Sequence, residues 1–141
     1  MKIAIVGLDD DFVIEFSNQL ASALNLQHVN FNSEYDKILL TSINQSLFET
    51  NDIMEEKETI LLKNLIDLDN VIISINDDAF LSNVNYKLLN NILTILIEKK
   101  ENDKILNNIQ KLIKKHCKLI INQENIEINS ILNKIRGNYN G

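Results

Sequence analysis

Residues 2–7 read KIAIVG, and residues 8–24 continue LDDDFVIEFSNQLASAL. The first segment is a run of apolar, largely β-branched side chains without alternation, which is typical of a strand buried on both faces of a sheet. In the second segment the apolar residues from Phe12 to Leu24 fall three or four positions apart, which predicts a helix. A buried strand followed by an amphipathic helix favours an α/β fold with a parallel sheet.

The same alternation continues along the chain. Further strands are predicted at residues 27–30, 71–75, 92–97 and 119–121. Helices are predicted at residues 33–47 with Ser33 as N-cap, and at 52–68, 84–90, 104–116 and 126–135, the last ending near Gly137. The pattern predicts a three-layer α/β sandwich whose five-stranded, mostly parallel sheet lies between helices. We expect a single domain over residues 1–136 and a flexible tail over 137–141.

The composition is typical of a folded domain, and it includes a single arginine, the side chain best suited to binding phosphate. The chain has 141 residues, of which 45% are hydrophobic and 24% charged. Of 14 basic residues only Arg136 is arginine, whose planar fork binds two oxygens of a phosphate or carboxylate. The lone Cys117 excludes a disulfide framework, and no apolar stretch is long enough for a signal peptide or a membrane span. We therefore expect a cytoplasmic protein.

Charge is distributed unevenly along the chain. Residues 1–80 hold 15 acidic and 4 basic side chains, whereas residues 81–141 hold 5 acidic and 10 basic ones, for a net charge of −6. This balance disfavours bulk nucleic-acid binding. Chance and solvated helix faces are the favoured explanation of this asymmetry, and head-to-tail self-association or an oppositely charged partner is the alternative. The segment Lys111–Lys118 (KLIKKHCK) would suit an acidic partner, an anionic membrane or nucleic acid, but its lack of arginine and aromatics favours a solvated helix face.

Two longer segments resemble shikimate kinase, a small P-loop enzyme that phosphorylates shikimate with ATP. Residues 3–32, IAIVGLDDDFVIEFSNQLASALNLQHVNFN, resemble that family's first strand, phosphate loop, first helix and second strand. Residues 68–85, LDNVIISINDDAFLSNVN, resemble its third strand, Gly-rich turn and following helix. The spacing of these blocks agrees from about residue 3 to 135. The resemblance implies a P-loop kinase topology.

The residues that a phosphate loop requires are replaced in this chain. The pattern GxxxxGK[ST] begins at Gly7, and its second glycine, its lysine and its hydroxyl fall on Phe12, Val13 and Ile14. The loop interior carries three carboxylates: Asp9, Asp10 and Asp11. Their charge would repel a triphosphate. We therefore expect no ATP binding, and we expect the apolar residues of this turn to fill the vacated pocket and leave a domain without a cleft.

The positions that would bind and activate shikimate are also replaced. The family's Asp-x-Asp pair falls on Asn30 and Asn32, and an amide cannot act as a base at neutral pH. The arginine for the shikimate carboxylate falls on Glu55, which reverses the charge. The Gly-rich turn falls on Asn76, Asp77 and Asp78. The lid would fall on residues 99–106, KKENDKIL, which are too few for a lid and contain no arginine.

These replacements favour a catalytically inactive member of the fold, a pseudokinase without a cofactor. Our first hypothesis is a scaffold or regulatory module that binds an unknown protein or a second copy of itself, with no nucleic acid, membrane or ATP as partner. The alternative is a small-ligand or divalent-cation site in the old phosphate crevice. In a P-loop sheet the first and third strands are neighbours, so their carboxyl ends would bring Asp9, Asp11, Asp77 and Asp78 together as candidate ligands. Against it, no cation-loop spacing is present, and these side chains can cap the following helices. A residual shikimate kinase is the third hypothesis.

No second catalytic arrangement is evident in the sequence. His28 and His116 have no metal-ligand neighbour three or four positions away, so both are predicted to be structural or exposed. Ser17 and Ser74 lack the G-x-S-x-G context of a nucleophile. Cys117 is predicted to be a buried, inert thiol.

Overall fold

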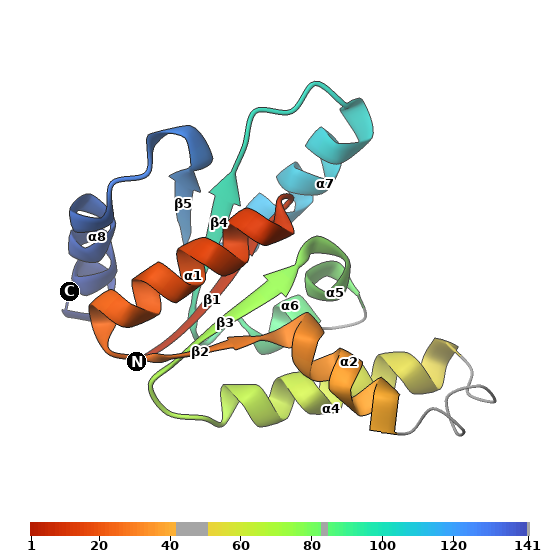
Figure 1. The fold of residues 1–141 in the computed structure, drawn as a ribbon. Helices are drawn as coiled ribbons and strands as arrows, with labels where there is room; N and C mark the ends of the chain where they lie inside the picture. Colours follow the sequence, from red (N-terminus) through yellow and green to blue (C-terminus); the bar gives the residue numbers. More distant parts are fainter. Residues whose placement is uncertain (42–50, 83–84, 141) are drawn as a thin grey trace.

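The chain folds into a parallel sheet with helices on both faces (Figure 1). The computed structural model describes residues 1–41, 51–82 and 85–140. Its strands are β1 (Lys2–Gly7), β2 (Gln27–Asn30), β3 (Val71–Asn76), β4 (Leu93–Glu98) and β5 (Leu119–Asn122). The helices are α1 (Asp10–Leu24), α2 (Phe31–Thr41), α4 (Asn51–Ile66), α5 (Asp77–Leu81), α6 (Asn85–Leu88), α7 (Lys104–Lys114) and α8 (Ile128–Asn140), with the short 3-10 helix η1 (Gln123–Asn125). None of the described helices is long and apolar enough to cross a membrane.

The strand order is β2-β3-β1-β4-β5, and all neighbouring strands are parallel. The central strand is β1, in which Ile3 is aligned with Ile72 of β3 on one side and with Leu93 of β4 on the other. The carboxyl ends of all five strands therefore lie at one edge of the sheet, where open α/β sheets bind their ligands. The predicted α/β class and five strands are confirmed, and the sheet is wholly parallel.

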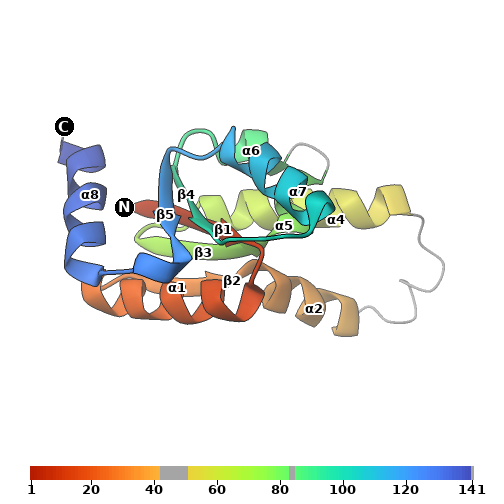
Figure 2. The same cartoon turned by 90° about the horizontal axis from the view of Figure 1, so that it is seen from above.

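Alternate side chains of β1 point into two hydrophobic cores. Ile3 and Ile5 pack against α1 and α8, whereas Ala4 and Val6 belong to the core beneath α2, α4, α5, α6 and α7. Figure 2 shows the sheet from the side, with α1 on one face and α4 to α7 on the other. Because both faces are covered, the three central strands β3, β1 and β4 are largely apolar rather than alternating, whereas the edge strand β2 is mostly polar. The predicted three-layer arrangement is confirmed.

Helix starts at the carboxyl edge differ from those predicted. The helix expected from Ser33 begins at Phe31, because Asn30 rather than Ser33 provides the capping oxygen: its Oδ1 accepts from the backbone N of Ser33 at 2.9 Å. Residues 42–47 of that predicted helix lie outside the described residues. The sequence did not predict α5, which Asn76 caps by accepting from the backbone N of Ala79 at 2.9 Å.

The last helix also differs from the prediction. It was expected to end near Gly137, but α8 continues through this glycine to Asn140. A Cβ atom on Gly137 would meet nothing within 4 Å, so this position is an exposed helical site. The mobility expected of residues 137–141 stays a prediction.

Candidate functional site at the carboxyl edge of the sheet

The turn that corresponds to a phosphate loop is only two residues long. The strand β1 ends at Gly7 and α1 begins at Asp10, so Leu8 and Asp9 connect them. In the strand–GxxxxGK[ST]–helix motif, four residues separate the two glycines, and the backbone amides of that loop surround the phosphates. Here α1 begins at the third of those four positions. The second half of the loop is therefore helical.

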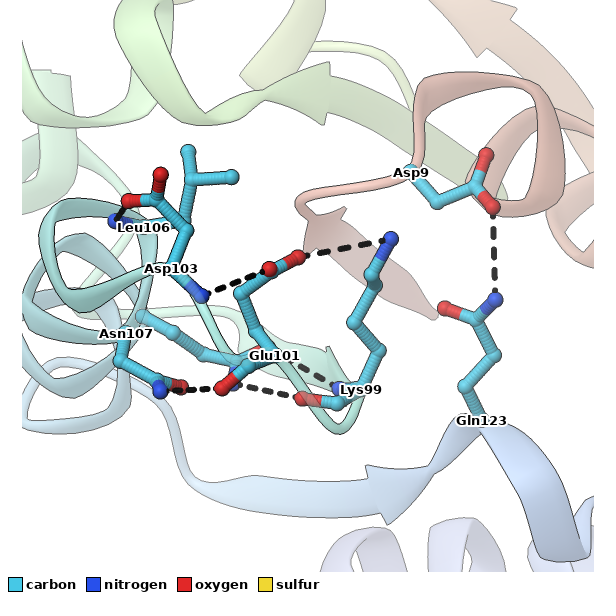
Figure 3. A network of polar contacts seen from close by, with 8 residues as sticks. Asp9, Lys99, Glu101, Asp103, Leu106, Asn107 and Gln123 are labelled. Carbon is cyan, nitrogen blue, oxygen red and sulfur yellow. Dashed lines mark hydrogen bonds and ion pairs between the residues drawn. The ribbon is translucent and has the colours of Figure 1, made fainter.

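Asp9 provides a carboxylate at the N-terminus of α1. Its Oδ1 accepts from the backbone N of Phe12 at 3.2 Å, and its main-chain oxygen accepts from the backbone N of Val13 at 3.0 Å. The other carboxylate oxygen, Oδ2, accepts from Nε2 of Gln123 in η1 at 3.3 Å (Figure 3). Amides at a helix N-terminus form a natural anion site. In this chain the free N-terminal amide of Phe12 already binds the Asp9 carboxylate, and the amide of Val13 makes the first hydrogen bond of the helix itself.

The apolar residues of the former loop lie on the sheet. Val13, which occupies the position of the P-loop lysine, is 2% exposed and belongs to the core between α1 and the sheet. Phe12 packs against the same core, and Ile14 is half-buried. A Cβ atom on Gly7 would lie 2.9 Å from Cγ2 of Val13 and 3.0 Å from the main-chain oxygen of Ile97. Gly7 therefore permits α1 to lie close to the strands.

The two acidic segments after β1 and β3 lie within electrostatic reach of one another. Burial raises the pKa of Asp10, and the negative charges of Asp77, Asp11, Asp9 and Asp78 raise it further. Burial, followed by the charge of Asp78, raises the pKa of Asp77. Clustered carboxylates that repel one another hold protons more tightly. The convergence expected from parallel strands is therefore present.

This acidic cluster does not form a metal centre. Among the residues that the structure describes, no group of three or more His, Cys, Asp or Glu side chains is placed to hold a metal ion. The four candidate ligands Asp9, Asp11, Asp77 and Asp78 are therefore not assembled into a cation site. Asp9 caps α1 instead, and Asp77 and Asp78 lie in the first turn of α5. Acidic residues in a first turn interact favourably with the helix dipole.

Side-chain amides of β2 and of the start of α2 bind β3 at the positions that the resemblance assigns to the Asp-x-Asp pair. Oδ1 of Asn32 accepts from the backbone N of Asn76 at 3.3 Å. Nδ2 of Asn30 donates to Oγ of Ser74 at 2.8 Å, in addition to its capping bond in α2. Glu55 lies in α4, and its side chain is outside the described part of the chain. The asparagines that replace the Asp-x-Asp pair thus make structural hydrogen bonds.

A polar chain that the sequence did not predict links α1, β2 and β3. Nδ1 of His28 lies 2.5 Å from Oδ1 of Asn18, and its Nε2 lies 2.8 Å from Oγ of Ser74. Because the Asn18 oxygen only accepts, Nδ1 carries the proton and Nε2 accepts from the serine hydroxyl. Burial lowers the pKa of His28, which favours this neutral ring. The order Asn–His–Ser is that of a catalytic triad, but Ser74 is 0% exposed and out of reach of a substrate.

Cys117, predicted to be a buried thiol, is only partly buried. Partial burial raises the pKa of the Cys117 thiol to about 12, so it stays protonated and unreactive at neutral pH. His116 stacks at 4.3 Å, ring centre to ring centre, on Tyr86. Ser17 is 0% exposed, and its hydroxyl has no hydrogen-bond partner within the described residues.

A short connection occupies the position that the resemblance assigns to the lid. The strand β4 ends at Glu98 and α7 begins at Lys104, so the connection has five residues. Gln110, which is 5% exposed, closes it by a paired amide contact. Its Oε1 accepts from the backbone N of Lys99 at 3.0 Å, and its Nε2 donates to the Lys99 main-chain oxygen at 2.9 Å. Two hydrogen bonds therefore hold Lys99, the first residue of the connection, against α7.

Further contacts fasten the rest of this connection (Figure 3). Asp103 caps α7 by accepting from the backbone N of Ile105 at 2.9 Å and of Leu106 at 3.0 Å. Asn107 donates to the main-chain oxygen of Glu101, whose carboxylate lies 3.8 Å from the ammonium group of Lys99. A movable lid needs a longer segment with few such contacts.

The crevice is reduced but not closed. A hollow of about 40 Å³, enough for about one water molecule, separates Val13 and Ile14 from Asn30. A second hollow, of about 160 Å³, lies beyond it, and its lining includes Asn32, Tyr35, Glu58, Asn76, Asp78 and Ser82. A third, of about 290 Å³, lies between α1 and η1 and is lined partly by Phe12, Phe16 and Gln123. The expected domain without a cleft is therefore wrong, although each hollow is smaller than a typical ligand pocket.

Comparison with solved structures identifies the architecture. Shikimate kinase from Aquifex aeolicus superimposes with a TM-score of 0.74 and 23% identity, covering 100% of this chain and 99% of that one. The enzyme from Bacteroides thetaiotaomicron gives 0.71 and 16%, over 100% and 99%. The enzyme from Acinetobacter baumannii in complex with shikimate gives 0.74 and 14%, over 97% and 93%. This chain has the fold of a shikimate kinase.

That likeness confirms the resemblance at the level of the fold. The sequence identities, between 14% and 23%, are too low to transfer an activity. A scan against protein-family models and a search of curated proteins found no match. Evidence for the function therefore comes from the residues at the carboxyl edge of this chain's own sheet.

Proposed function

We propose that this protein is a catalytically inactive, shikimate-kinase-like domain that acts by binding another protein. The observation that carries the proposal is the two-residue turn between β1 and α1. A phosphate loop binds by converging amides, a lysine and a hydroxyl. Here the amides of Phe12 and Val13 bind Asp9, and Val13 and Ile14 stand where the lysine and the hydroxyl would be.

Electrostatics supports the same proposal. Three carboxylates, Asp9, Asp10 and Asp11, occupy the turn that corresponds to the phosphate loop, and Asp77 and Asp78 lie within electrostatic reach of Asp10. Two unit charges about 4 Å apart repel by roughly 4 kcal/mol at an effective dielectric constant near 20, whereas a helix N-terminus contributes only about 0.3–1 kcal/mol. The hydrophobic cores are intact, whereas the carboxyl edge of the sheet carries carboxylates that repel phosphate. Such a domain is suited to binding another protein through its solvent-exposed surface.

The acceptor site supports the proposal independently. Catalysis needs a base close to the hydroxyl that attacks ATP. Asn30 and Asn32 have no basic group, and both already bind backbone or side-chain groups of the neighbouring elements. In addition, the five-residue connection after β4 contributes no arginine to a transferred phosphate. Phosphoryl transfer would lack its base and its charge-neutralising groups.

The proposal is tested by thermal unfolding with and without Mg²⁺–ATP and shikimate. A ligand at 100 times its Kd adds about 2.7 kcal/mol, which shifts the Tm of a domain of this size by several degrees. We expect no shift with either ligand, alone or together. A reproducible rise with Mg²⁺–ATP would overturn the proposal, and turnover of shikimate would establish the residual kinase.

The second candidate is a small-ligand or cation-binding protein, and the hollow of about 160 Å³ favours it. Glu58 and Asp78 contribute carboxylates to this hollow, and Tyr35 contributes an aromatic ring. The same thermal assay with Ca²⁺, Mn²⁺ and small amines in place of ATP distinguishes the two candidates. A shift with one of these alone would support the second.

A further inference from the structure

The solvent face of α7 combines lysines with exposed apolar side chains. The opposite face packs on the sheet through Ile113 and Gln110, which are 0% and 5% exposed. Six exposed residues, one or two helical turns apart, make up what we call the α7 face: Lys104, Ile105, Asn108, Lys111, Leu112 and Lys115. The helix begins beside the five-residue connection and lies at the outside of the fold (Figure 2).

Two apolar side chains form one row of this face. Ile105 is 72% exposed and Leu112 is 48% exposed. They are seven residues apart, so they lie two turns apart on the same side of the helix. A single exposed apolar side chain is common, but two aligned on one helix form the anchor spacing by which an amphipathic partner helix binds.

Three lysines form the adjacent row. Lys104, Lys111 and Lys115 follow at intervals of seven and four residues, which places them on one side of α7. No ion pair joins any of the three to an acid within residues 1–41, 51–82 and 85–140. By contrast, Lys114, on the flank of the helix, lies 3.0 Å from Glu98. The row thus retains positive charge that the described part of the fold does not neutralise.

We propose that the α7 face binds an acidic amphipathic helix of another protein. The carboxylates of that helix would meet the lysine row, and its apolar side chains would lie on Ile105 and Leu112. This inference rests on the proposed binding function and names the surface and the chemistry of the partner. Charge complementarity favours this occupant, because the face has three lysines and no acidic side chain.

The charge of the whole chain argues against an extended polyanion as the occupant. The net charge is −6, and residues 1–80 hold 15 acidic against 4 basic side chains. A membrane or nucleic-acid surface would face this negative half as well as α7. A short helix touches α7 alone, and charges beyond about 10 Å are screened at 0.1 M salt.

The test uses two fluorescent peptides and fluorescence anisotropy. The probe is a designed helix of about three turns, the length of α7, with leucines seven residues apart beside a row of glutamates. The control peptide has the same composition in scrambled order. We expect the probe to bind at least about tenfold more tightly than the scrambled peptide. The affinity should fall as salt is raised from 50 to 500 mM, because the charges are exposed.

Matched variants locate the binding site. We expect K111E/K115E to weaken binding of the probe at least about tenfold and to bind a peptide whose glutamates are replaced by lysines, a charge-swap rescue. Ile105→Ser with Leu112→Ser should weaken binding in both salt conditions. Ile60→Ser with Lys63→Glu, two exposed positions on α4, is the control and should leave binding unchanged. All four substituted residues of the test variants are exposed, so we expect the substitutions to change stability little. Unfolding temperatures close to that of the wild type would verify that the variants are folded.

Three outcomes would overturn the inference. Equal binding of the probe and the scrambled peptide would show that the α7 face has no preference for an ordered acidic helix. Binding to vesicles with anionic lipid that K111E/K115E abolishes would assign the face to a membrane. A dimer in sedimentation that Ile105→Ser with Leu112→Ser dissociates would assign it to a second copy. A thermal shift with Mg²⁺–ATP bears on the proposed function alone, so the two failures are distinguishable.

Discussion

The turn after β1 and the connection after β4 lie on neighbouring strands at the same edge of the sheet, yet they are stabilised by opposite chemistry. Each ends in an aspartate that caps a helix, Asp9 for α1 and Asp103 for α7. Asp9 is followed by two more acids and lies near a second acidic run, whereas the connection to Asp103 is closed by neutral amides. The first region retains repulsion at neutral pH. The second is held by neutral amides and by the attraction of oppositely charged Lys99 and Glu101.

The largest expected change in stability comes from the connection after β4, which neutral amides close. Gln110→Ala removes both partners of the Lys99 backbone and leaves buried groups without hydrogen bonds. We expect a loss of about 1–3 kcal/mol in the free energy of unfolding, measured with urea. Asn108→Ala, an exposed position on the same helix, should stay within about 0.5 kcal/mol of the wild type. Equal effects of the two variants would refute a structural role for the amide pair.

A smaller loss of stability is expected from changing Asp9, which caps α1 in the acidic turn after β1. Asp9→Ala removes the oxygen that accepts from the backbone N of Phe12, which should cost about 1 kcal/mol. The loss is limited because the same change removes one of the charges that raise the pKa of Asp10. Asp9→Asn keeps the capping oxygen and loses the charge, so its free energy of unfolding should be close to that of the wild type. If both variants lose equal stability, the charge matters rather than the cap.

The smallest effect is the pH dependence of the acidic side. Because the pKa values of Asp10 and Asp77 are raised in the folded state, the folded chain binds protons more readily than the unfolded one. Stability from these groups therefore rises as pH falls from neutral towards their ordinary value of 3.8. Asp10→Asn and Asp77→Asn should each stabilise the neutral protein by less than about 1 kcal/mol, because both side chains are partly exposed to screening solvent.

The contributions of Asp10 and Asp77 are isolated by the difference in the free energy of unfolding between the wild type and each variant, measured from pH 7 to pH 4. The comparison is needed because His28 acts in the opposite direction: its pKa is lowered, so the unfolded state binds its proton first and acid destabilises the fold. The gain from Asp10→Asn should disappear towards pH 4. A gain that is the same at both pH values would rule out repulsion among the carboxylates.

The strands could be predicted from sequence because a parallel strand covered on both faces must be apolar throughout. The helix starts were less secure. Asn30 and Ser33 are both good capping residues, and only the structure shows which oxygen accepts the bond. The five residues of α5 are too few for helical periodicity. Gly137 carries a helix-stop signal, but the α8 residues Ile131 and Ile135 are buried and hold the helix in place beyond it.

The site was only partly predictable. Convergence of the acids after β1 and β3 follows from parallel strands, and it was expected. The early start of α1 was not: Asp9, Asp10 and Asp11 carry a helix-start signal, but the apolar spacing that predicted the helix begins only at Phe12. The contact of His28 with Ser74 depends on the alignment of β2 with β3, which no local pattern specifies.

The position of β1 at the centre of the sheet has a consequence for synthesis on the ribosome. Its partners are made much later, since Ile3 is aligned with Ile72 and with Leu93. At about 5–20 residues per second, roughly 5–20 s pass before β4 exists to cover the second edge. During that interval an apolar strand has unpaired backbone groups that can join another nascent chain. The second edge of β1 therefore stays unpaired until the fourth strand has emerged.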